Sequence, residues 1–176
     1  MRIHQATILL FAGALAGQVA SAAADDLQIP PRKAGQWDIT MAMGHGLPEM
    51  KAQMCLDDTT DKAMMAAGLS LSKTVCPEQS AVRDGDDIVI DSKCEMGRMK
   101  TASHIVISGD FQSTYTVHIT GTIEGMPKGM SNKTDITQTV TWAGAECTGG
   151  LKPGEMAMPG GIKIDATKLM KSMGGG

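Results

Sequence analysis

Hydrophobic and polar residues alternate most regularly between residues 111 and 123. The hydrophobic members of this alternation are Phe111, Tyr115, Val117 and Ile119. A period of two predicts a strand with one buried side and one solvent-facing side. The turn sequence Ser108-Gly109-Asp110 comes directly before it, so residues 101–107 and 111–123 are expected to form a hairpin.

Shorter patterns of the same kind predict the remaining strands, at residues 37–43, 50–56, 79–83, 88–94 and 135–142. The polar residues 57–61 favour a helix start, and we expect a short helix of about two turns that Gly68 closes. The strands follow one another through short turns without helical crossovers. The chain is therefore predicted to be mainly β, an antiparallel meander of about seven strands that forms a curved sheet or a small half-open barrel.

The two ends of the chain differ from this β pattern. Residues 1–22 have a short positive start, an apolar run and the cleavage motif Ala20-Ser21-Ala22, which together predict a signal peptide and export to the periplasm. After cleavage we expect a leader at 23–31, a β domain at 32–147 and a flexible tail at 148–176 with a short helix over 165–173. The mature chain is predicted to have no transmembrane segment, because no later apolar run approaches the necessary length.

Composition limits the classes of function. The net charge of −3 and the absence of a basic run argue against binding to nucleic acid. Aromatic residues make up 3% of the chain, whereas there are 15 methionines, so we expect a soft core filled by Met, Ile, Val and Ala. The oligomeric state is left open.

The four cysteines, Cys55, Cys76, Cys94 and Cys147, all lie in the exported part. An even number of cysteines in an oxidising compartment predicts two disulfides, and their wide spacing is unlike that of zinc ligands. If the hairpin loop is centred on Gly85, position 76 lies opposite position 94. We therefore prefer Cys76–Cys94 and Cys55–Cys147 among the three pairings.

Three stretches resemble a known family: residues 32–40 around Gly35-Gln36-Trp37-Asp38, the order of the cysteines beginning with Cys55-Leu56, and residues 108–111. Together they resemble the domain of unknown function 3617, a family of small exported bacterial envelope proteins. The resemblance covers about residues 30–147, and it implies fold and compartment but no site residue. One departure is that 29 residues follow the last cysteine, which in the family usually comes near the chain end.

The leading functional hypothesis is a non-enzymatic binding module. A curved sheet can enclose an apolar hollow, and the residues expected to line it are Ile105, Ile107, Phe111, Tyr115, Val117 and Ile119. The expected partner is an apolar small molecule, a lipid or an envelope protein. The alternative is that these side chains fill the centre of a small barrel as ordinary core residues and leave no hollow.

The methionines suggest a second hypothesis. Met41, Met43 and His45 together offer two thioethers and an imidazole, which are ligands that suit Cu(I) in a low-affinity periplasmic copper-binding protein. A face of methionines also packs as ordinary core. No pair of acid–base residues is indicated by spacing, so we expect neither an enzyme nor a bound cofactor apart from this copper alternative.

Overall fold

The computed structural model describes residues 29–174 except 45, 128 and 130. The predicted signal peptide, and the leader up to residue 28, lie outside these residues. The described elements are β1 (Gly35–Met43), β2 (Met50–Leu56), α1 (Asp58–Val75), β3 (Glu78–Asp84), β4 (Asp87–Met96), β5 (Met99–Asp110), β6 (Thr114–Glu124), β7 (Lys133–Gly144), β8 (Glu155–Ala157), β9 (Lys163–Asp165) and α2 (Ala166–Gly174).

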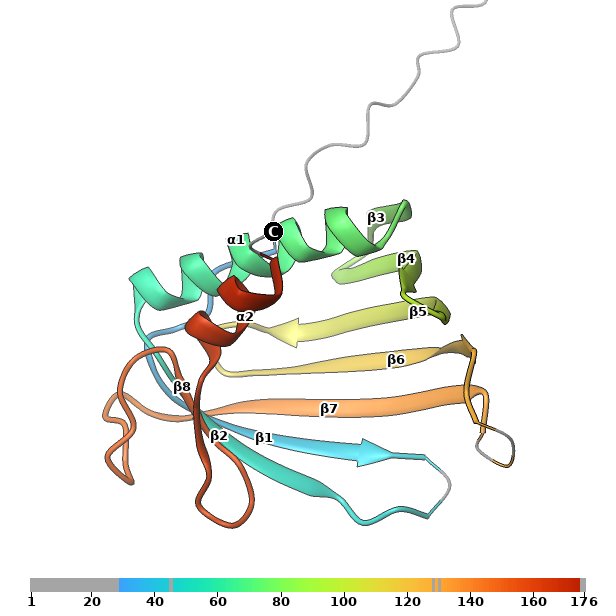
Figure 1. The fold of residues 1–176 in the computed structure, drawn as a ribbon. Coiled ribbons are helices and arrows are strands. Elements are labelled where there is room, and N and C mark those ends of the chain that lie inside the picture. The colour runs from blue at the N-terminus through green and yellow to red at the C-terminus, as the bar shows by residue number, and fades with distance from the viewer. Residues whose placement is uncertain (1–28, 45, 128, 130, 175–176) are drawn as a thin grey trace, which may run out of the picture.

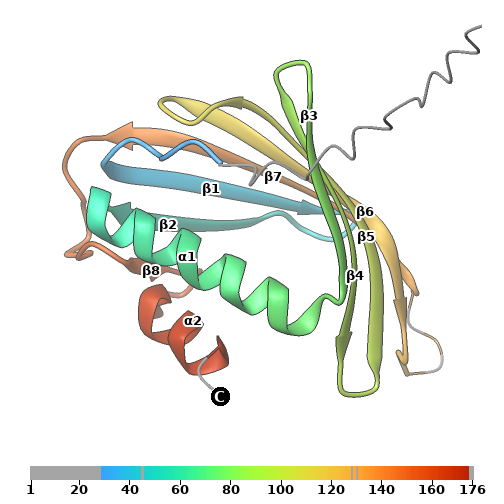
Figure 2. The same ribbon diagram turned by 90° about the horizontal axis from the view of Figure 1, so that it is seen from above.

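In this part of the chain, nine strands form one open antiparallel sheet in the order β3-β4-β5-β6-β7-β1-β2-β8-β9. The expectation of a mainly β, curved antiparallel sheet is thus confirmed, with nine strands instead of about seven. The meander runs from β3 to β7, and the first strand of the domain then pairs with β7. Figure 2 shows the sheet bending around α1 and α2, which both lie on its concave side.

The core lies between α1 and this concave face. Trp37 is 0% exposed, its indole N–H donates to the carbonyl oxygen of Lys33, and its ring lies 5.8 Å from that of Tyr115. Ile39 and Val140, directly paired between β1 and β7, continue the same buried face. With few aromatic rings, the chain places its one fully buried tryptophan where β1, β7 and the helix layer meet.

Helix α1 is longer than the sequence pattern indicated. It runs for 18 residues through Gly68 and ends at its C-cap, Cys76, so the expected helix of about two turns was wrong. Asp57 does start the helix: its side chain accepts from the backbone N–H of Thr60, while the Thr60 hydroxyl oxygen accepts from the backbone N–H of Asp57. Packing on the sheet offsets the cost of about 1 kcal/mol that one glycine imposes within a helix.

The segment after Cys147 has more regular structure than a flexible tail. Leu151 is buried, β8 pairs with β2, and α2 realises the short helix expected over 165–173. At the start of the segment, the backbone N–H and the hydroxyl of Thr148 both donate to the carboxamide oxygen of buried Gln36. The described part of the tail therefore extends the sheet and adds a second helix beside α1 (Figure 1).

Both disulfides are present in the expected pairing, Cys55–Cys147 and Cys76–Cys94. The register used to derive the second pair was wrong by one residue. Asp84 pairs with Asp87, so the hairpin turn has two residues and position 94 lies opposite position 77. Cys76 is instead the cap at the end of α1, and its disulfide joins the helix to β4.

None of the helices within the described residues is long and apolar enough to cross a membrane.

Candidate functional site

An apolar cavity of about 340 Å³ lies between α1 and the concave face of the sheet. Its sheet wall consists of Ile107 from β5, Tyr115 and Val117 from β6, and Phe111 from the turn between these strands. Its helix wall includes Met64, Met65 and Leu69 of α1 and Met170 of α2, and residues 29 and 30 of the leader and residue 32 directly after it also line the cavity. The cavity is therefore bounded by segments from both ends of the domain.

The structure brings together four of the six residues predicted to line a hollow: Ile107, Phe111, Tyr115 and Val117. Ile105 and Ile119 face each other across β5 and β6, two residues further along the same face. Ile105 packs against the core, and neither of the two lines the cavity. The alternation of β6 correctly identifies the face, but it does not show where α1 crosses that face.

The β5–β6 turn holds the aromatic part of the wall in place. Gly109 has φ +110°, and a Cβ atom there would lie 2.6 Å from the carbonyl oxygen of Thr114. Asp110 accepts hydrogen bonds from the backbone N–H of Gln112 and the hydroxyl of Ser113. Both hydrogen bonds lower the pKa of Asp110, and the one from Gln112 has the larger effect. Phe111 consequently stacks on Tyr115 with ring centroids 4.7 Å apart.

An ion pair joins Arg32, the residue directly after the leader, to the first turn of α1 beside the cavity. The Asp61 carboxylate accepts the backbone N–H of Arg32 at 2.9 Å and the Nε–H of the same residue at 2.7 Å. The side chains are 12% exposed for Arg32 and 2% exposed for Asp61. Asp61 is thus a buried carboxylate whose charge is compensated by one guanidinium, which itself lines the cavity.

Sequence reasoning missed the helix wall and the leader. Ending the predicted helix at Gly68 hid the spacing of Met64, Met65 and Leu69, which places apolar residues on one helical face. Ile29 was assigned to the leader at 23–31 and Arg32 to the start of the β domain, and neither was expected to line a cavity. The spacing of the three apolar helix residues was a readable signal, whereas nothing local marks Arg32 as a cavity residue.

Of the residues in the copper hypothesis, Met41 and Met43 lie on β1 on the same face as Ile39, and both are half-buried. Met41 pairs directly with Met50 of β2. His45 lies outside the described residues, so the copper site stays a prediction. Among the residues that the structure describes, no group of three His, Cys, Asp or Glu side chains is arranged to hold a metal ion.

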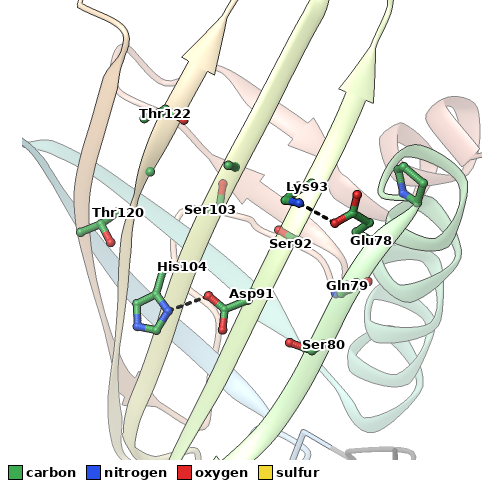
Figure 3. Close-up of a pocket in the computed structure, with 13 residues that line it drawn as sticks. Glu78, Gln79, Ser80, Asp91, Ser92, Lys93, Ser103, His104, Thr120 and Thr122 are labelled. Atoms are coloured by element: carbon green, nitrogen blue, oxygen red, sulfur yellow. Dashed lines mark hydrogen bonds and ion pairs between the residues drawn. The ribbon is translucent and has the colours of Figure 1, made fainter.

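A larger hollow of about 700 Å³ lies over the outer, polar side of β3 to β6. His104 faces Asp91 across β5 and β4 at 2.8 Å, and Lys93 contacts Glu78 at 2.6 Å (Figure 3). All four side chains are at least half exposed, so water competes with these pairs and they bind each other only weakly. This hollow is larger than the apolar cavity, but its charged side chains are solvated and paired with each other.

The family model described as "Protein of unknown function (DUF3617)" matches residues 32–147. No curated protein matches the chain, and no solved structure does.

Proposed function

Since this match spans well over half of the chain, the protein belongs to the DUF3617 family, and on that premise we propose that it is a non-enzymatic periplasmic protein that binds one small apolar molecule. The binding site is the cavity between α1 and the sheet. The observation that carries the proposal is the cavity's lining, which joins two aromatic rings, four methionine or leucine side chains and three β-branched side chains around one space.

Size and chemistry support this class of ligand. Ligand cavities in proteins typically have about 300–1,000 Å³ and mostly apolar walls with a few polar groups. A volume of 340 Å³ corresponds to roughly ten methylene-sized groups, if each takes the ~30 Å³ that one water molecule occupies. A single acyl chain fits this space, whereas a folded segment of an envelope protein is too bulky for it. Methionine side chains adapt to ligands of different shape.

Binding is proposed rather than catalysis because of the groups that face the ligand. The described residues that line the cavity include no carboxylate, imidazole or thiol, and the hydroxyl of Ser72 is hydrogen-bonded to the Leu69 carbonyl oxygen and the Gln79 carboxamide oxygen, neither of which is a general base. The periplasmic location rests on the two disulfides, which persist in oxidising compartments, together with the predicted signal peptide.

Titration with the neutral dye N-phenyl-1-naphthylamine tests the proposal, because its fluorescence rises when it enters an apolar site. The wild-type protein is expected to bind the dye, and Val117→Trp, which fills the cavity, is expected to abolish this binding. Val82→Trp is the matched control, since Val82 is also a strand valine but is 55% exposed on the outer face. Leu69→Trp, on the exposed part of the helix wall, is a second blocking variant with little risk to folding.

Two results would contradict the proposed function. One is the absence of saturable dye binding to the wild-type protein. The other is binding by folded Val117→Trp and Leu69→Trp that equals binding by the Val82→Trp control.

A further inference from the structure

The guanidinium of Arg32 has hydrogen-bonding capacity that no described residue uses. An arginine side chain carries five N–H donors. Only Nε–H has a partner in the described part of the chain, namely Asp61, and the two Nη groups donate to no described residue. No described buried side-chain nitrogen or oxygen lacks a partner, so the Nη groups keep access to solvent, and Arg32 lines the cavity.

Two other polar side chains of the lining, Ser72 and Gln79, are engaged with each other, whereas the hydroxyl of Tyr115 offers a single donor that is bonded to no described residue. The hydroxyl of Ser72 lies within hydrogen-bond distance of the Leu69 carbonyl oxygen and of the Gln79 carboxamide oxygen. Arg32 therefore provides the largest set of unused donors against an otherwise apolar surface. A ligand that fills the cavity with hydrocarbon alone would displace water from these donors and give them nothing in return.

The charge of Asp61 decides which kind of acceptor suits these donors. Asp61 is 2% exposed and already neutralises Arg32, so an anionic head group would bring a second carboxylate near the first in a site of low dielectric. An uncharged carbonyl oxygen accepts the same hydrogen bonds without that repulsion. It also leaves the pair between Arg32 and Asp61 intact.

We propose that the ligand of this cavity is an acyl ester or acyl amide, and that Arg32 selects it by donating from Nη to the uncharged carbonyl oxygen while the acyl chain occupies the apolar part. This inference rests on the proposed function, since it assigns a head group to the same ligand. It makes Arg32 a specificity-determining residue, and it makes Asp61 the residue that favours an uncharged head group over an anionic one.

Displacement of N-phenyl-1-naphthylamine by three probes of equal chain length tests the inference: methyl decanoate, decane and decanoate. In the wild-type protein the ester is expected to bind roughly tenfold more tightly than the alkane, as one hydrogen bond to a charged donor implies. Decanoate is expected to bind less tightly than the ester. In Arg32→Met/Asp61→Asn, which removes the pair without leaving a buried charge, the preference of the ester over the alkane should disappear.

A matched control is Lys93→Met/Glu78→Gln, which removes an exposed ion pair on the outer face and should leave the preference unchanged. Arg32→Lys is the second variant in case the double variant does not fold. It keeps a positive charge beside Asp61 but lacks the guanidinium fork, so the preference should fall there as well.

The outcomes separate the two proposals. Equal wild-type affinity for ester and alkane overturns the role of Arg32 but leaves the apolar site in place. Tightest binding of decanoate overturns the argument from Asp61. If neither the dye nor any of the three probes binds saturably, the proposed function itself is overturned.

Discussion

Removing the side chain of Arg32 should destabilise the protein severely, because it leaves the buried charge of Asp61 without a compensating positive charge. In Arg32→Met the carboxylate keeps the backbone N–H of residue 32 but loses the Nε–H at 2.7 Å and the compensating charge. Breaking one side of a buried ion pair typically costs about 3–5 kcal/mol. Because whole domains are stable by only about 5–15 kcal/mol, the variant loses a large part of its free energy of unfolding.

Urea unfolding monitored by tryptophan fluorescence measures this loss, since Trp37 is fully buried in the native state. In a thermal melt, the midpoint should fall by roughly 6–20 °C for a chain of this size. The exposed pair of Lys93 and Glu78 provides the control. Lys93→Met should change the free energy of unfolding by no more than about 1 kcal/mol.

A second substitution tests the reason for the loss. Arg32→Met/Asp61→Asn removes the stranded charge, so the double variant is expected to be more stable than Arg32→Met alone. If the double variant is instead the less stable of the two, or if Arg32→Met costs under about 1 kcal/mol, the buried charge is not what Arg32 compensates.

Three further predictions concern the scaffold. Replacing Cys55 and Cys147 by serine should lower the free energy of unfolding in urea by about 5 kcal/mol, against about 3 kcal/mol for the pair separated by 18 residues, and equal losses would refute this loop-length argument. Gly35→Ala should cost about 1–3 kcal/mol in the same assay, because a Cβ there would clash with the backbone carbonyl oxygen of residue 144, whereas alanine at position 144 meets no atom within 4 Å and serves as the control. The pKa of Asp165 is lowered below its usual 3.8 by hydrogen bonds, first from the hydroxyl of Thr167 and then from the backbone N–H of Lys168. The ionised Asp165 side chain therefore stabilises α2 at pH values above 3.8, and this stabilisation is lost as the pH falls toward the lowered pKa. The protection of the α2 amides, measured as their exchange rate relative to the intrinsic rate at the same pH, should therefore fall on acidification below about pH 4 in the wild type but not in Asp165→Asn.

Much of the sheet could be predicted from the sequence because strand patterns are local. The alternation of β6 and the turn before it define a hairpin without any knowledge of distant residues. The length of α1 could not be predicted in the same way. Gly68 is a helix terminator by local preference, and the packing of α1 on α2 and β4, which are distant in the sequence, carries the helix through it.

For the cavity, too, the parts that follow local patterns could be predicted, and the parts that depend on distant residues could not. Residues on one strand face, such as Tyr115 and Val117, could be grouped from their spacing. Arg32 could not, because its role depends on Asp61, which lies 29 residues away along the chain. The short strands β8 and β9 were also missed, since three-residue strands between glycine-rich turns have too little alternation to be recognised.

The two disulfides affect how quickly a ligand could enter and leave. Cys55 lies two residues before the N-cap of α1 and is bonded to Cys147, while the C-cap Cys76 is bonded to Cys94 of β4. A helix fixed at both ends cannot swing away from the sheet as a hinged lid, a motion that takes microseconds to milliseconds. Entry then depends on rotations of flexible side chains such as Met65 and Leu69, which take place within nanoseconds. The oxidised protein should accordingly exchange the proposed ligand without a slow opening step of α1.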